Sequence, residues 1–191
     1  LGIRTDQHEE QELIRKGYLV AFRMDYEGCV IRDYHTTHVP SSGTGRNRHT
    51  FFTRRDELKA PEKDISTILS SRDYRCDTYA TVFITPTENS PYSLQDLLSS
   101  LKNPVFVLYL GRKSCPPALP LHPRIISANT LKEASSMIPL SSIPLKRRRD
   151  YHLRFFWEDG ILSGLQELHA IVRRDEPVSR KRRQFANRIE H

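Results

Sequence analysis

The sequence predicts an α+β fold of the ferredoxin-like type, and three features lead to this prediction. The expected elements follow one another as strand, strand, long excursion, strand, helix and strand. One further strand and helix ahead of Leu1 would complete the β-α-β-β-α-β order of that fold. The chain has no initiator Met, so we expect an N-terminal piece to precede it. Its 191 residues suit one domain, or a domain with a long excursion.

A turn separates the first two predicted strands. Residues 17–24 (GYLVAFRM) and 29–34 (CVIRDY) have the apolar and aromatic content of strands, and the turn lies at residues 26–28. We expect the second strand to return beside the first. Residues 35–64 then combine Pro, Ser and Gly with arginines and have little hydrophobic periodicity. A loop of about 30 residues inside a compact domain is usually functional or mobile.

A second block of strand-forming residues follows the excursion. Residues 77–85 (DTYATVFIT) indicate a central strand, and the apolar residues 105–110 (VFVLYL) indicate a further one, whereas residues 65–74 are ambiguous. Between the two predicted strands, Ser93 and Asp96 form a capping box ahead of a helix with its leucines on one face.

The last third of the chain is expected to contain one short helix and further extended segments. Thr130 and Glu133 form a second capping box at the start of that helix. Residues 151–157 and 166–172 are expected to be extended, and residues 180–185 (RKRRQF) form a basic tail.

The charge balance indicates a polyanionic partner. Lys and Arg total 30 against 23 Asp and Glu, which gives a net charge of +7, and arginine outnumbers lysine. Because Arg binds phosphate in a bidentate way and stacks on bases, this composition favours nucleic acid over a basic protein without such a partner. Residues 173–176 (RRDE) are expected to neutralise one another. No stretch approaches roughly 18 apolar residues, so no transmembrane span is predicted.

The three cysteines, Cys29, Cys76 and Cys115, are widely spaced and odd in number. They form no C-x-x-C pair, so the sequence predicts neither a zinc site nor a disulfide framework. This cysteine usage fits a reducing cytoplasm.

The turn after the apolar residues 105–110 is the first candidate site. Gly111 lets the backbone approach a ligand closely, and Arg112, Lys113 and Ser114 follow it at once. Two cations and a hydroxyl can hold a phosphate by charge and hydrogen bonds. It is no Walker loop, because G-x-x-x-x-G-K-[ST] is absent. The alternative is an ordinary turn with solvated cations.

The second candidate site lies at the end of the second predicted strand. Tyr34 or His35 could stack on a base, and Arg32 could pair with phosphate. His35 and His38 are spaced like a metal pair, but no Cys or carboxylate follows at ligand spacing, so no metal site is predicted. The alternative is a local Arg32–Asp33 pair with Tyr34 packed.

The excursion is the third candidate site, because its cations alternate with aromatic side chains. That pattern suits single-stranded nucleic acid, with cations for the backbone and rings for the bases. The alternative is a flexible basic loop without a partner. The residues concerned are Arg46, Arg48, His49, Phe51, Phe52, Arg54 and Arg55.

These segments, taken together and in order, resemble the Cas-five family, as it occurs in the type I-E CRISPR surveillance complex called Cascade. The most specific piece is residues 109–116 (YLGRKSCP), followed by residues 31–36 (IRDYHT). Residues 174–177 (RDEP) and 183–185 (RQF) support it. The likeness spans nearly the whole chain, although the excursion and residues 118–150 match only loosely.

The resemblance implies a single domain: a ferredoxin-like (RRM-like) RAMP palm with a projecting thumb. The palm would comprise residues 1–35 and 65–145, the thumb about residues 36–64, and a small β-rich C-terminal part residues 146–191. The family's first strand and most of its first helix would precede Leu1.

The resemblance also implies a non-catalytic subunit that binds the 5′ handle of CRISPR RNA in antiviral defence. It would cap the backbone of Cas-seven-family subunits next to the large PAM-recognising subunit, and meet target DNA only through the complex. The implied location is the prokaryotic cytoplasm, without a membrane partner, cofactor or metal. In type I-C relatives the family member is itself an endoribonuclease that processes precursor CRISPR RNA. A metal-independent endoribonuclease, using Tyr34, His35 and Lys113, is therefore the alternative.

Under the resemblance, the candidate sites become one expected RNA-binding surface. The Gly111 turn would grip the handle beside the end of the second strand, and the thumb arginines would contact RNA or an adjacent subunit. No catalytic residue is expected. The RNA-binding set is Arg32, Tyr34, His35, Arg46, Arg48, Arg54, Arg55, Gly111, Arg112, Lys113 and Ser114.

Overall fold

The computed structural model describes residues 1–4, 6–40, 50–61, 64–140, 153–179 and 184–191. Helices and antiparallel strands both occur along the chain, so the fold is α+β, as the sequence predicts. The chain divides into two compact units. The first unit consists of residues 1–26 and 79–191, and the hairpin unit of residues 27–78.

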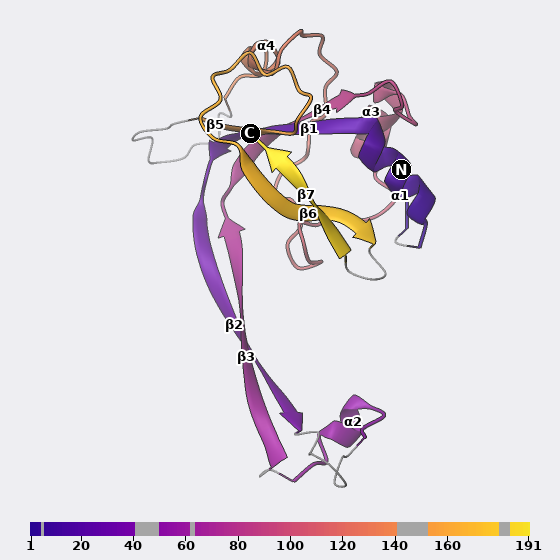
Figure 1. Cartoon of the computed structure of the whole chain (residues 1–191), viewed down its shortest axis with the longest axis vertical. Coiled ribbons are helices and arrows are strands. Elements are labelled where there is room, and N and C mark those ends of the chain that lie inside the picture. The colour runs from indigo at the N-terminus through magenta and orange to yellow at the C-terminus, as the bar shows by residue number, and fades with distance from the viewer. Residues whose placement is uncertain (5, 41–49, 62–63, 141–152, 180–183) are drawn as a thin grey trace. The chain divides into compact units, whose positions relative to one another are not determined.

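The first unit contains a three-stranded antiparallel sheet in the order β4-β1-β5 (Figure 1). β1 (Tyr18–Tyr26) lies in the centre, between β4 (Tyr79–Pro86) and β5 (Arg154–Trp157). The strands predicted at residues 17–24 and 77–85 are confirmed. The central position predicted for residues 77–85 is wrong, because β1 pairs on both sides while β4 is at an edge among the described strands.

The first unit also contains the helices α1 and α3. α3 (Leu94–Lys102) begins at the predicted capping box, in which the Asp96 amide donates to Ser93 Oγ and the Ser93 amide donates to the Asp96 carboxylate, both at 3.1 Å. α1 (His8–Gly17) was not predicted. Its acidic first turn and basic last turn complement the helix dipole.

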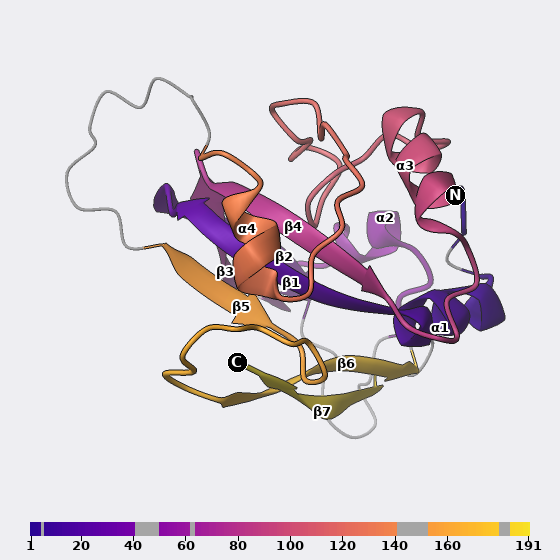
Figure 2. The ribbon, with the colours of Figure 1, turned by 90° about the horizontal axis from the view of Figure 1, so that it is seen from above.

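α4 (Leu131–Ser136) covers the sheet and completes the core (Figure 2). Thr130 caps it as predicted, accepting from the Glu133 amide at 3.1 Å, but the Glu133 carboxylate accepts from the amide of Asn129. The buried cluster joins the sheet to the helix because each of the three strands contributes one apolar side chain. Its members are Ala21, Phe83, Leu131 and Trp157.

A buried arginine lies beside this core. Arg23 on β1 is 2% exposed and forms a bidentate pair with Asp25, at 2.5 and 3.2 Å. Its Nη1 donates to the carbonyls of Ser135 and Ile138, at 2.8 and 3.1 Å, which lie at the C-terminal end of α4. Thr81 on β4 donates to the same Asp25 carboxylate at 2.9 Å. The charge therefore ties two strands to the end of a helix.

The C-terminal residues form a second antiparallel pair, which the sequence did not predict as a hairpin. β6 (Ile171–Ser179) pairs with β7 (Gln184–Glu190), with register shifts near Pro177. Of the segment predicted to be extended at residues 166–172, only residues 171 and 172 belong to a strand, β6, and the prediction for residues 166–170 is wrong. Part of the predicted basic tail at residues 180–185 belongs to β7, and residues 180–183 lie outside the described residues.

Backbone hydrogen bonds and an ion pair are among the contacts that attach this C-terminal hairpin to the rest of the first unit. The backbones of Trp157 and His191 exchange two hydrogen bonds, at 3.1 and 3.0 Å. Arg15 on α1 pairs with Glu176 on β6. Residues 173–176 do not neutralise one another as predicted, because Arg173 pairs with Glu190 and Asp175 pairs with Arg188.

The apolar residues 105–110 do not form the predicted strand. Val107 is 84% exposed and Leu110 is 73% exposed. No described strand pairs with this segment, so its backbone joins no ladder of hydrogen bonds. Apolar composition alone therefore did not decide its structure.

The hairpin unit is a long antiparallel ribbon of β2 (Cys29–Pro40) and β3 (Ile65–Cys76). The strands pair without a register shift, extend over about 40 Å each, and twist about one another (Figure 1). β2 pairs with β3 and not with β1, so the predicted return of the second strand is wrong. The predicted loop is also wrong at residues 35–40, because these residues belong to β2. The boundaries of a thumb at about residues 36–64 stay a prediction.

The ribbon escaped prediction because most of its side chains are exposed on both faces, which removes hydrophobic alternation. The short helix α2 (Arg54–Glu57) follows the cap residue Thr53, whose side chain accepts a hydrogen bond from the Asp56 amide.

None of the helices that the structure describes is both long enough and apolar enough to cross a membrane.

Candidate nucleic-acid interface

The expected RNA-binding residues fall into both units. Gly111, Arg112, Lys113 and Ser114 belong to the first unit, and those of β2 and α2 belong to the hairpin unit. Arg46 and Arg48 lie outside the described residues. The predicted adjacency of the Gly111 turn and the end of the second strand stays a prediction. The residues within the hairpin unit are Arg32, Tyr34, His35, Arg54 and Arg55.

The Gly111 turn is closed by its own backbone. The Leu110 amide donates to the Cys115 carbonyl at 2.8 Å, and the Cys115 amide donates to the Arg112 carbonyl at 2.9 Å. Gly111 has a φ of +79°, and a Cβ there would have no heavy atom within 4 Å. The glycine is therefore required by its left-handed backbone and not by a crowded neighbour.

This turn presents polar groups to solvent. Lys113 and Ser114 are exposed, whereas Arg112 is half-buried. An exposed ammonium next to an exposed hydroxyl can bind one phosphate by charge and a hydrogen bond.

On β2, the expected site residues divide between the two faces of the ribbon. Successive side chains of a strand point to opposite faces, so Arg32 and Tyr34 share one face, and Asp33 and His35 share the other. Tyr34 is 60% exposed, so the packed alternative for this ring is wrong. The exposed ring can stack on a base.

Arg32 is held by a partner across the ribbon. Its Nε and Nη2 donate to the two carboxylate oxygens of Asp73 at 2.7 and 2.9 Å, and the two residues are direct register partners. These hydrogen bonds raise the pKa of Arg32 and lower the pKa of Asp73. The pair differs from the Arg32–Asp33 pair considered as the alternative. A phosphate would share Arg32 with Asp73, which a guanidinium with five donors permits.

His35 is also paired within the ribbon. Its Nε2 lies 2.7 Å from Oδ2 of Asp33, on the same face, and both residues are half-buried. A carboxylate beside an imidazole orients the ring. Here the Asp33 carboxylate occupies Nε2 of His35, so this nitrogen is not available to a ligand.

The two arginines of α2 differ in their contacts. Arg54 donates to Glu57 at 2.5 Å and to the His38 carbonyl at 2.7 Å, so it joins α2 to the ribbon. Arg55 is exposed and forms no ion pair with the described residues. Of these two cations, Arg55 is therefore the more accessible to a polyanion.

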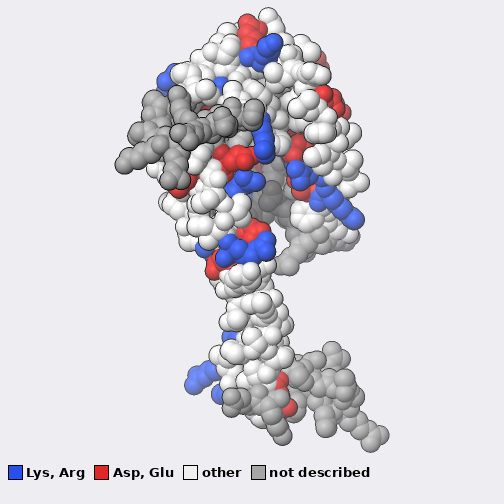
Figure 3. All heavy atoms as spheres, turned by 90° about the vertical axis from the view of Figure 1, so that its left-hand side faces the viewer, with Lys and Arg blue, Asp and Glu red and all other residues white. Residues whose placement is uncertain are grey.

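Positive charge does not form a continuous surface on the face drawn in Figure 3. Lys and Arg side chains there lie next to Asp and Glu, and the middle of the ribbon carries few charges. Binding of a polyanion at this face would therefore depend on individual contacts more than on a broad basic field.

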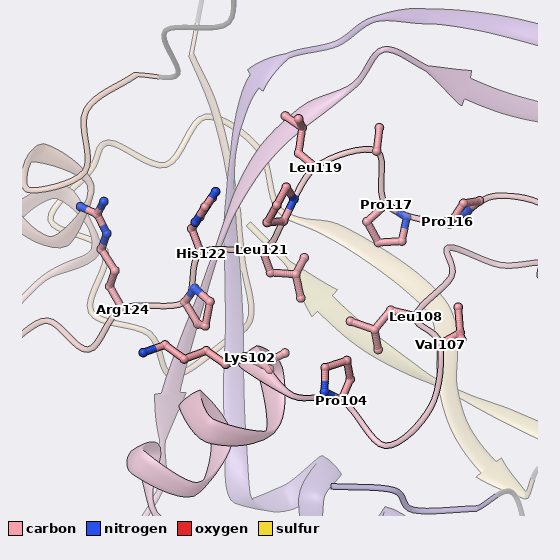
Figure 4. Close-up of a pocket in the computed structure, with 14 residues that line it drawn as sticks. Lys102, Pro104, Val107, Leu108, Pro116, Pro117, Leu119, Leu121, His122 and Arg124 are labelled. Atoms are coloured by element: carbon pink, nitrogen blue, oxygen red, sulfur yellow. The ribbon is translucent and has the colours of Figure 1, made fainter.

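Sequence reasoning missed an open groove beside the Gly111 turn. The groove has a volume of about 730 Å³ and lies between the end of α3 and the proline-rich residues 116–124. Figure 4 shows Lys102, His122 and Arg124 along one side, with Leu108 and neighbouring prolines on the other. In the sequence, this region was marked only by a run of prolines. Such a run predicts an extended backbone but does not reveal a groove.

A second cavity, of about 510 Å³, lies on the C-terminal hairpin and was also missed. Arg174, Val178, Gln184 and Phe185 line it. Arg174 and Phe185 combine a cation with a partly exposed ring, a composition that suits stacking.

Known proteins are similar to this chain in sequence and in fold. The model of the family described as CRISPR-associated protein (Cas_Cas5) matches residues 1–189. The CRISPR system Cascade subunit CasD of Escherichia coli (strain K12) is 30% identical over 122 residues, which are 63% of this chain and 51% of CasD. The chain thus spans about half the length of this curated relative.

Solved structures are also similar in fold. A chain of a CRISPR RNA-guided surveillance complex has a TM-score of 0.57 and 24% sequence identity, over 93% of this chain and 67% of that chain. At this identity, the likeness concerns the fold.

Proposed function

Because this chain belongs to the Cas5 family of CRISPR-associated proteins, we propose that it is a subunit of a CRISPR RNA-guided surveillance complex. The observation that carries the proposal is the family match over residues 1–189. The similarity to a Cascade subunit and to a chain of a surveillance complex supports it.

In its finer form, the proposal assigns the chain to a type I-E complex in the prokaryotic cytoplasm, as part of antiviral defence. There it binds the 5′ handle of CRISPR RNA and caps the Cas-seven-family backbone next to the large PAM-recognising subunit. Guide pairing reads the target DNA, so this chain meets DNA only through the complex.

Handle binding requires contacts to phosphates and to splayed bases. The Gly111 turn supports phosphate binding, because Lys113 and Ser114 are exposed on a loop closed by its own backbone. In the hairpin unit, Tyr34 on β2 supports base stacking, and Arg32 on β2 and Arg55 on α2 support phosphate contacts.

Lys113 provides a direct test of the phosphate contact. The full chain is titrated with handle RNA over a series of salt concentrations. We expect Lys113→Ala to weaken binding and to reduce the salt slope by about 0.7–0.9, which corresponds to one lost phosphate contact. Lys132→Ala is the matched control, since Lys132 is exposed on α4 and outside the proposed site. Equal losses in both variants would contradict a specific role for the turn.

A second measurement compares handle binding with cleavage. Unprocessed repeat RNA is incubated with the protein without divalent metal, with the natural handle and with a scrambled one. We expect binding that weakens for the scrambled handle and no cutting. Binding of both RNAs with equal affinity would indicate a sequence-indifferent structural spacer.

Cutting at the 5′ boundary of the handle would instead assign a metal-independent endoribonuclease. The geometry does not favour this alternative. Tyr34 and His35 lie on opposite faces of the ribbon, and the His35 ring is paired with Asp33.

A further inference from the structure

Two cysteines that lie far apart in the sequence are direct partners across the ribbon. The register of β2 and β3 begins with Cys29 opposite Cys76, at the open end of the hairpin. Both are free thiols; Cys29 is exposed and Cys76 is half-buried.

The backbone register gives the two residues a Cα separation that a disulfide can span. Directly opposed residues of antiparallel strands have Cα atoms about 4.5 or 5.5 Å apart, and disulfides join Cα atoms about 4.4–6.8 Å apart. Side chains of opposed residues also lie on the same face, so both sulfurs point to one side of the ribbon. The next pair on that face is Ile31 opposite Tyr74.

The backbone around this pair is closely constrained. Gly28 has a φ of +67°, and a Cβ there would lie 1.9 Å from the Cys76 carbonyl oxygen. Asp77, which follows Cys76, has a φ of +58°. Both strands therefore enter the ribbon through left-handed residues, which hold the first register pair in place.

We propose that Cys29 and Cys76 form a reversible disulfide that locks the open end of the ribbon when low-molecular-weight disulfides accumulate. The proposal is independent of RNA binding, because it rests on the register of β2 and β3 alone.

The reaction proceeds by two thiol–disulfide exchanges with glutathione disulfide as the oxidant. The thiolate of the exposed Cys29 attacks one sulfur of glutathione disulfide, forming a mixed disulfide and releasing one glutathione thiolate. The Cys76 thiolate then attacks the Cys29 sulfur, forming the Cys29–Cys76 bond and releasing the second glutathione. The protein loses two electrons and two thiol protons, and the two glutathione molecules gain them.

The bond would tether the two strands covalently at their first register pair. A two-stranded ribbon without a covering layer is only marginally stable, and its ends open most readily. A covalent link at the first register pair limits that opening along the neighbouring residues.

The test uses the full chain at a series of ratios of reduced to oxidised glutathione. Free thiols are trapped with N-ethylmaleimide, and linked peptides are identified by mass spectrometry. We expect an intramolecular Cys29–Cys76 bond in the wild type and in Cys115→Ser, and its loss in Cys29→Ser and Cys76→Ser. Amide hydrogen exchange in β2 and β3 should slow about tenfold or more on oxidation of the wild type.

Other outcomes overturn the proposal. Glutathione that remains on Cys29 without a Cys29–Cys76 bond would show that the thiols do not meet. A bond that involves Cys115, or links between molecules alone, would do the same. A Cys29–Cys76 bond that leaves amide exchange in β2 and β3 unchanged would refute the lock.

Discussion

At the scale of single residues, Arg23 makes several buried polar contacts in the first unit. Its guanidinium contacts Asp25, two carbonyls at the end of α4 and the side chains of Thr81 and Ser135. A buried charge is tolerated only when it is paired and hydrogen-bonded, and here the pairing joins elements that are distant in sequence.

Replacing Arg23 should therefore destabilise the protein strongly. Arg23→Leu leaves the Asp25 carboxylate buried without its partner, and we expect a loss of about 3–5 kcal/mol in the free energy of unfolding measured in urea. Arg124→Leu is the control, because Arg124 is exposed, and it should change stability by less than about 0.5 kcal/mol. A small effect of Arg23→Leu would mean that the network is not formed in solution.

Two glycines with similar backbone angles should respond differently to alanine. Gly111→Ala meets open space and adds only left-handed strain, for which we expect about 1 kcal/mol. Gly28→Ala adds the same strain and a clash with the Cys76 carbonyl, so we expect a loss above about 3 kcal/mol. Thermal unfolding of both variants measures the difference, and equal losses would contradict the close contact at Gly28.

At the scale of elements, α1 is joined to the C-terminal hairpin by a small ion-pair cluster. Arg15 pairs with Glu12 on its own helix and with Glu176 on β6, and Lys16 also contacts Glu12 at 3.1 Å. The hydrogen bonds from Arg15 and Lys16 lower the pKa of Glu12 to about 2. The cluster therefore depends on an ionised Glu12.

This dependence predicts an effect of pH on stability. A depressed carboxyl pKa stabilises the folded state above the ordinary value of 4.5, and the contribution is lost as the pH falls toward 2. Glu12→Gln should be less stable than the wild type at pH 6, by less than about 1 kcal/mol because the pair is largely exposed. The difference should shrink at pH 3.

Urea unfolding at the two pH values measures this change. Glu10→Gln is the control on the same helix, because Glu10 forms no ion pair with the described residues. A Glu12→Gln difference that stays constant between pH 6 and pH 3 would contradict the proposed role of the ionised carboxylate.

At the scale of the whole molecule, the proposed RNA contacts are divided between the first unit and the hairpin unit. Tyr34 belongs to the ribbon and Lys113 to the Gly111 turn. If one RNA contacts both, the two side chains contribute independently to one binding free energy.

A double variant tests this division. Tyr34→Ala should cost about 1–3 kcal/mol of binding through lost stacking, whereas Tyr34→Phe should retain the affinity. The losses of Tyr34→Ala and Lys113→Ala should add in the double variant, as measured by RNA titration. If either single variant binds the RNA with wild-type affinity, the unit that contains the substituted residue does not contribute to handle binding.

Local sequence determined the elements whose signals lie within a few residues. The capping side chains at Ser93 and Thr130 mark their helices because their hydrogen bonds reach only three or four positions along the chain. The strand composition of residues 17–24 and 77–85 was also sufficient. The ordered motifs around residues 31–36 and 109–116 were enough to indicate the family, which the match over residues 1–189 confirms.

Only the tertiary structure decided the features that depend on distant partners. Residues 105–110 have the composition of a strand, but a strand requires a neighbour, and no described strand pairs with them. The partner of Arg32 is Asp73, and Cys29 meets Cys76, because the register of β2 and β3 brings them together. Such pairings follow from which strands meet and in what register, which no short stretch of sequence contains.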